Sequence, residues 1–221
     1  MSANLKLISA LGLAASFATA ALADDKLPIG RYADFALSST ETTLTDIDDL
    51  VVRRWTDNSG ENIARLVSVD RAQKLAVVTL DSARMTLKIP LGWYAIDDGE
   101  RGAVFTPDEM VRVVARQVDL TLEGTKTIAE YAQIKRGLLI QRFPQSEAIE
   151  QKLGAGIIMN IYRHVPARPN DNGPREIYEI ITADPKDSNR AQLTTLGVPD
   201  GQGARYLPLL GLIIQDRVLN W

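Results

Sequence analysis

The run MTLKIPLGWYAI at residues 85–96 constrains the fold more than any other stretch of this sequence. Apolar and polar side chains alternate in its first half, and this period of two requires a strand with one buried face. Pro90 cannot donate a backbone hydrogen bond, so it predicts the end or edge of that strand. Gly92 permits a bend, and Trp93 and Tyr94 then add large apolar area. We predict a strand, a corner and a buried aromatic plug; a binding groove at Trp93 and Tyr94 is the alternative.

Residues 1–23 predict a secretory signal peptide. Lys6 gives a weakly positive start, and a run of mostly Ala, Leu, Ile and Phe follows over 7–22. That run is shorter than the roughly 20 residues that span a bilayer. Ala21 and Ala23 fit the small-residue pattern of a signal-peptidase site. We therefore expect cleavage after Ala23, export, and a mature chain without a membrane span.

The composition indicates the cellular compartment of the protein and argues against one class of partner. The chain has 221 residues, no cysteine and a formal net charge of −3 at pH 7. An exported chain without disulfides is more typical of a bacterial periplasm than of a eukaryotic secretory route. The mild acidity lacks the basic footprint of a nucleic-acid-binding protein. We expect a periplasmic protein with no nucleic-acid partner.

The mature sequence divides into an arm and one domain. Residues 24–62 form a polar N-terminal arm, in which Thr45 and the acidic residues after it predict a short helix at 46–55. Residues 63–221 are long enough for a single core. Apolar alternation and turn-forming residues predict its strands at 63–69, 74–80, 85–89, 103–106, 148–153, 157–164, 176–183 and 190–196, with a C-terminal helix at 206–219.

Two sequence patterns predict different secondary structures after residue 106. Thr106, Pro107 and Glu109 have the spacing of a helix start. The β-branched residues that follow and the alternation from Val118 favour a strand instead. We predict a turn and then a strand at 111–122.

A helix at 128–142 fits without conflict. Thr127 and Glu130 form a capping box, and Pro144 ends the helix. Lys135 and Arg142 fall on its apolar side. The usual interpretation is that their stems pack while their charges reach water; the alternative is a helix edge that contacts a partner. The apolar face is predicted to contain Ile128, Tyr131, Ala132, Ile134, Leu138, Leu139 and Phe143.

The order of these features resembles the PsbP-like superfamily, which includes DcrB-like periplasmic proteins. The resemblance covers about residues 63–221. It is carried by the IPLGW corner at 89–93, the TIAEYA helix start at 127–132, the long strands after it, the Thr-Ala before a turn at 182–183 and the terminal helix that begins YLPLL. It implies an α/β/α sandwich around a mainly antiparallel sheet, an α+β architecture. It also implies an accessory role beside an envelope complex.

The inventory of reactive residues favours a protein that is not an enzyme. His164 is the single histidine and lies at a strand end, so we expect a surface or capping side chain. With no cysteine, neither a Cys-His nucleophile nor a His/Cys zinc site can be built. We predict no catalytic residue, cofactor or metal. Acidic turns are interpreted as solvated surface, with a cation site as the alternative: Asp46, Asp48 and Asp49; Asp97, Asp98 and Glu100; Asp184 and Asp187.

These observations lead to three hypotheses. The first is an exported, non-enzymatic accessory or interaction protein of the bacterial periplasm, with Lys135, Arg142, Trp93 and Tyr94 as candidate partner-binding residues. The second is a soluble protein that binds a small ligand or a cation, through an acidic turn or the Trp93 corner. The third is a hydrolase with a carboxylate pair, although the sequence singles out no such pair.

Overall fold

The computed structural model describes residues 26–37, 64–169 and 171–221. The predicted signal peptide and the predicted helix at 46–55 lie outside the described residues. The part that is described forms one 3₁₀ turn, η1 (Tyr32–Asp34), two α-helices and eleven strands. The helices are α1 (Ile128–Arg142) and α2 (Gly203–Asp216).

The strands form two antiparallel sheets. The smaller, in the order β1-β2-β3-β11, contains β1 (Arg65–Asp70), β2 (Leu75–Leu80), β3 (Met85–Pro90) and β11 (Val218–Leu219). The larger has the order β4-β5-β6-β10-β9-β8-β7. Its strands are β4 (Tyr94–Asp97), β5 (Gly102–Phe105), β6 (Arg112–Asp119), β7 (Glu147–Gly154), β8 (Ile157–Val165), β9 (Arg175–Ala183) and β10 (Arg190–Pro199).

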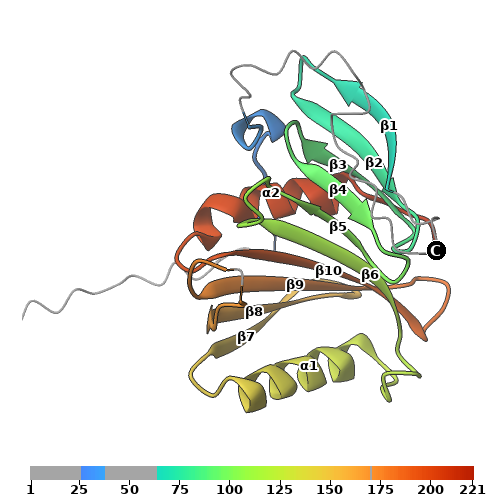
Figure 1. Cartoon of the computed structure of the whole chain (residues 1–221). Helices are drawn as coiled ribbons and strands as arrows, with labels where there is room; N and C mark the ends of the chain where they lie inside the picture. The colour runs from blue at the N-terminus through green and yellow to red at the C-terminus, as the bar shows by residue number, and fades with distance from the viewer. Residues whose placement is uncertain (1–25, 38–63, 170) are drawn as a thin grey trace, which may run out of the picture.

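The two helices lie on opposite faces of the larger sheet (Figure 1). α1 covers β7, β8 and β9, and α2 lies on the other face, between the larger sheet and the smaller one. Each helix closes its own apolar cluster, a large one around α2 and a small one under α1. The predicted α+β architecture, with an α/β/α arrangement around an antiparallel sheet, is confirmed; the smaller sheet adds a further layer beyond α2.

The predicted corner is where the chain passes from one sheet to the other. β3 ends at Pro90 in the smaller sheet, and β4 begins at Tyr94 in the larger one. Gly92 has φ +85°, a conformation that glycine adopts without steric cost. The sequence analysis expected an aromatic plug after the corner and did not predict β4, because four residues are too few to establish a period.

Trp93 is completely buried at this corner, as predicted. Its indole N–H donates to the backbone oxygen of Phe35, at 3.1 Å. The backbone of Leu37 donates to Leu91, and a side chain at Gly92 would meet Leu37 at 3.0 Å. The described part of the N-terminal arm thus covers the corner, and the hypothesis that Trp93 lines an open groove is wrong.

The rest of this N-terminal segment packs along α2. Gly30 donates a backbone hydrogen bond to the oxygen of Pro208, and the rings of Phe35 and Tyr206 are 6.0 Å apart. A Cβ built on Gly211 would lie 2.0 Å from the oxygen of Pro28, so only glycine lets the segment approach α2 so closely.

Element boundaries differ from the predictions mainly near the C-terminus. The predicted strand at 111–122 is confirmed in type as β6, but β6 ends at Asp119 and Leu122 lies exposed in the turn that follows. The segment before β6 is a turn and not a helix. β10 continues to Pro199, past the predicted end at 196. α2 begins and ends three residues earlier than predicted, since Val218 leaves the helix to pair with Thr86 of β3.

Trp93→Ala should lower the free energy of unfolding by about 3–5 kcal/mol, because it removes a large buried ring and leaves a cavity. Trp93→Phe should cost less, since it keeps one aromatic ring in the core and loses the rest of the indole with the hydrogen bond to the Phe35 oxygen. Thermal unfolding followed by circular dichroism measures both. An unchanged melting temperature for the alanine variant would contradict the burial of Trp93.

Candidate interaction surface on α1

The ends of α1 are fixed by its own sequence. The Glu130 backbone N–H donates to Thr127 Oγ1 at 3.1 Å, and the Lys126 N–H donates to the Glu130 carboxylate at 2.7 Å. These two bonds satisfy amides that a helix start leaves without partners. The predicted bounds of 128 and 142 are confirmed.

The predicted apolar face of α1 is confirmed for part of its residues and wrong for Ile134 and Leu138. Tyr131 and Ala132 are buried against the larger sheet, as expected. Ile134 is 44% exposed and Leu138 is 59% exposed. The helix therefore turns two large apolar side chains to solvent.

Two cationic side chains of α1 face the sheet: Lys135, which was predicted on this side, and Arg136, which was not. Lys135 Nζ lies 3.0 Å from Glu179 Oε1, and the Glu179 side chain is buried on β9. Arg136 donates to Asn160 Oδ1 at 2.7 Å and forms an ion pair with Glu150. Lys135 therefore differs from the expected solvated lysine, because its partly exposed side chain pairs with a buried carboxylate at the helix–sheet interface.

The polar groups under α1 form a connected network. Tyr162 donates its hydroxyl to Glu179 at 2.8 Å and accepts from the Asn160 side-chain amide at 3.1 Å. The same amide donates to the backbone oxygen of Ala132 in α1. Burial, and then the negative charge of Glu179, raise the pKa of Tyr162 well above its ordinary value, so the hydroxyl keeps the proton that it donates.

Glu179 explains the orientation of the helix. A buried carboxylate is costly unless a cation and hydrogen bonds compensate it. The helix supplies that cation as Lys135, and a rotation that buried Ile134 and Leu138 would withdraw it. The sequence signal was a glutamate among the apolar residues of β9, with an asparagine similarly placed on β8; a charge inside a buried strand predicts a partner on the element that covers it.

The outward side of α1 forms a small apolar surface, which we call the outer α1 surface and define by Ile134, Gly137 and Leu138. A Cβ added to Gly137 would meet nothing within 4 Å, so the space above the glycine is open. Arg142 lies one turn beyond Leu138; it is exposed, and its guanidinium carbon is 5.1 Å from the centre of the Phe143 ring.

The structure separates the four predicted partner-binding residues. Trp93 is buried and unavailable to a partner, and Tyr94 is half-buried, with its ring 5.9 Å from that of Phe105. Lys135 points into the interface with β9, and Arg142 points out. Only Arg142 is exposed beside the outer α1 surface.

His164 and the acidic turn at residues 97–100 have local structural roles, whereas Asp46, Asp48 and Asp49 lie outside the described residues. His164 is exposed, as predicted, and its Nδ1 lies 2.8 Å from Asp200 Oδ2. Asp97 is buried, and its carboxylate accepts from the backbone amides of Ser82 and Gly99. Within the described ranges, no three acidic or histidine side chains converge as metal ligands.

Comparisons with known proteins are sparse. No family model and no curated protein matches this chain. Among solved structures, a mutant of the protein Mog1 has a TM-score of 0.45 and 10% identity, over 71% of this chain and 95% of that one. The Ran-binding protein Mog1p of Saccharomyces cerevisiae has a TM-score of 0.42 and 9% identity, over 72% of this chain and 96% of that one. At these TM-scores the likeness carries no argument about function.

Among the described residues, no helix is long and apolar enough to cross a bilayer.

Lys135→Gln should lower the free energy of unfolding by about 1–3 kcal/mol, because it leaves the buried Glu179 without its cation. The control Arg142→Gln removes the same charge from an exposed site and should change stability by no more than about 0.5 kcal/mol. Chemical denaturation of both variants tests this. Equal stabilities would mean that the Lys135–Glu179 pair does not hold α1 in its orientation.

Proposed function

We propose that this chain is an exported, non-enzymatic interaction protein of the bacterial periplasm, and that it holds a protein partner against the outer α1 surface. The observation that supports this most directly is the orientation of α1. Its cations Lys135 and Arg136 face the sheet, while Ile134 and Leu138 face solvent.

The outer α1 surface has the chemistry of a protein contact. Two apolar side chains one turn apart provide area for burial, and Gly137 between them lets a partner approach the helix backbone. Adjacent exposed apolar side chains on a folded surface are typical of contact sites. Arg142 lies at the edge of this surface, where a carboxylate of the partner would find it exposed. A partner with an apolar centre and an acidic margin fits best.

The periplasmic location rests on sequence. The apolar run at 7–22, the small residues Ala21 and Ala23, and the absence of cysteine support it. The resemblance of residues 63–221 to PsbP-like and DcrB-like proteins points to the same compartment and to an accessory role beside an envelope complex.

One observation favours the second hypothesis, a small-ligand-binding protein. A hollow of about 440 Å³ lies between the 106–111 turn and the start of α2, and its lining includes Leu37, Met110 and Tyr206. This volume is in the range of small-molecule sites. The Trp93 corner, which that hypothesis named, is covered by residues 35–37. On the described residues, no observation favours the carboxylate-dependent hydrolase.

Expression in a Gram-negative host tests the export proposal. The chain should be released by osmotic shock, and its intact mass should correspond to a start at Asp24. Ala23→Leu should block this processing, because the cleavage site requires a small side chain. Recovery of the wild-type chain with residues 1–23 attached, in the cytoplasmic fraction, would contradict the proposal.

In vivo photo-cross-linking tests the surface. A photo-reactive residue in place of the exposed Gln133, beside the outer α1 surface, should give an adduct of one defined mass. The double change Ile134→Gln and Leu138→Gln should abolish the adduct while changing stability by no more than about 0.5 kcal/mol, since both side chains are exposed and Gln is a good helix former.

The matched control is Val67→Gln, which removes a 60% exposed apolar side chain from β1 in the other sheet and should leave the adduct intact. A photo-reactive residue at Ser68 should not give the same adduct. An adduct that persists in the double variant, or no adduct at all, would contradict the proposed surface.

A further inference from the structure

The face of the larger sheet that carries α1 extends beyond the helix. Alternate residues of β6, β9 and β10 point to this face, and toward one end of the strands their side chains form a floor. A hollow of about 40 Å³ lies over that floor, and its walls are Arg112, Arg168 and Arg175. The floor residues are Val114, Ile177, Thr195 and Gly197.

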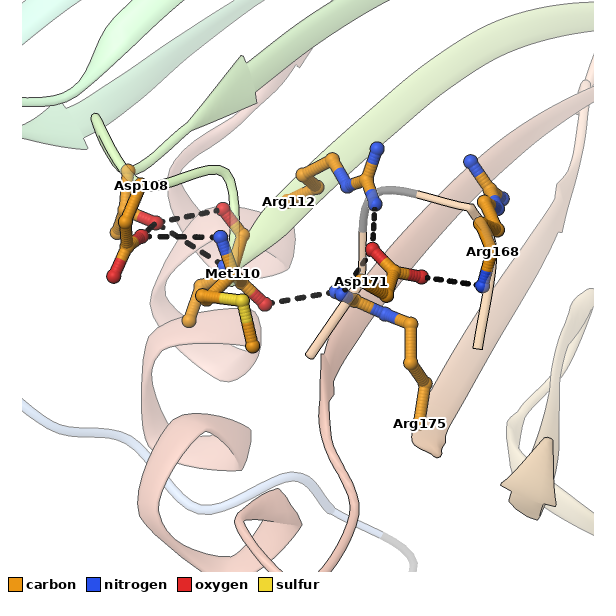
Figure 2. Close-up of polar contacts among 8 residues, drawn as sticks. Asp108, Met110, Arg112, Arg168, Asp171 and Arg175 are labelled. Carbon is orange, nitrogen blue, oxygen red and sulfur yellow. Dashed lines mark hydrogen bonds and ion pairs between the residues drawn. The ribbon is translucent and has the colours of Figure 1, made fainter. Parts of the chain in front are cut away.

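One carboxylate holds two of these arginines in place (Figure 2). Asp171 Oδ1 lies 2.5 Å from Arg112 Nη2 and 3.0 Å from Arg175 Nη1, and the Asp171 side chain is buried. The Arg168 backbone N–H donates to the other oxygen of Asp171 at 3.2 Å, while the Arg168 side chain turns away from that carboxylate (Figure 2).

Arg175 is the fixed member of the group. Its side chain is only 5% exposed, and Nη2 donates to the backbone oxygen of Met110 at 2.8 Å. The guanidinium lies across Gly197, where a Cβ would be 3.3 Å from Nη2. Burial lowers the pKa of Arg175 below its ordinary value; Asp171 opposes this shift, and the positive charges of Arg112 and Arg168 add to it.

The charges around the hollow do not balance. Three arginines line it, and in the part of the chain that the structure describes, Asp171 is the one carboxylate that pairs with Arg112 and Arg175. Glu179, the next acidic side chain along this face of β9, is bound to Lys135 and Tyr162. Arg112 and Arg175 share one carboxylate and the exposed Arg168 adds a further positive charge, so the hollow has a net positive charge that favours an anion.

We propose that Arg112, Arg168 and Arg175, with the Thr195 hydroxyl, bind a phosphate group. A dianionic tetrahedral oxyanion matches the excess charge, and its several oxygens can accept from more than one arginine at once. The hollow has room for a group of a few non-hydrogen atoms and excludes a complete nucleotide or sugar. The phosphate is either free or the terminal group of a small monoester whose remainder projects into solvent.

This site is independent of the proposed function. The hollow is formed by β6, β9, β10 and residues before β9, and it shares no residue with the outer α1 surface. Substitutions at Ile134 and Leu138 that abolish partner binding should leave phosphate binding unchanged. Substitutions in the hollow that weaken phosphate binding should leave partner binding unchanged.

Isothermal titration calorimetry of the purified chain tests the proposal at constant ionic strength. Inorganic phosphate and phenyl phosphate are the two probes, and sodium chloride is the blank. Binding of both assigns the site to phosphate groups in general, and binding of inorganic phosphate alone assigns it to the free ion; either supports the proposal. No saturable heat with either probe would overturn it.

Arg168→Gln is the decisive variant, because the side chain is exposed and its loss does not disturb the buried Arg175–Asp171 pair. It should weaken phosphate affinity about tenfold, the effect of losing one charge-assisted contact. Arg168→Lys should have an intermediate phosphate affinity, since lysine keeps the positive charge but loses the paired N–H donors of the planar guanidinium. Arg142→Gln removes an exposed arginine elsewhere and should bind as the wild type does.

Equal affinities for the wild type and Arg168→Gln would place any bound phosphate elsewhere and overturn the proposal. Circular dichroism confirms that each variant is folded. The comparison between variants also removes the general stabilising effect of phosphate on folded proteins, which acts on all of them alike.

Discussion

The contact between Lys135 and Glu179 decides how one face of this protein is arranged. A carboxylate in the middle of an otherwise apolar strand must find a cation when a helix covers it. Lys135 reaches it at 3.0 Å, and Arg136 satisfies Asn160 beside it. The cost of satisfying these groups is that Ile134 and Leu138 face solvent. An exposed apolar surface on α1 is thus the consequence of a polar requirement in the sheet.

Strand β9 contributes residues both to the interface with α1 and to the hollow lined by arginines. Its residues at positions 175, 177, 179 and 181 point to the same face. Ile181 lies in the apolar cluster under α1, Glu179 holds the helix through Lys135, Ile177 forms part of the floor of the hollow, and Arg175 lies in its wall. Along this face β9 therefore carries Ile181 and Glu179 under α1, and then Ile177 and Arg175 at the hollow beyond the helix.

On the opposite face of the larger sheet, apolar side chains pack together in the main core. α2 contributes Leu207, Leu209, Leu210 and Ile213 to one large apolar cluster, which both sheets share. Residues 26–37 close the corner between the sheets, because the Phe35 backbone oxygen accepts the Trp93 N–H and the segment packs on α2. Fold stability comes mainly from this side, which leaves the α1 side free to carry polar networks and an unbalanced group of arginines.

The sequence alone determined the architecture, because local patterns reflect local physics. Alternation placed most strands of the domain, the Thr127 capping box placed α1 to the residue, and Pro90 and Gly92 placed the corner. It did not determine which side of α1 faces the sheet, because apolar periodicity records the number of apolar residues on a face and not the charges beneath it. Nor did it bring Arg112, Arg168 and Arg175 together, since they lie on β6, in the loop before β9 and on β9, and only the register of those strands makes them neighbours. Tertiary structure decided both surfaces, because each depends on charges from different elements that only the folded chain brings together.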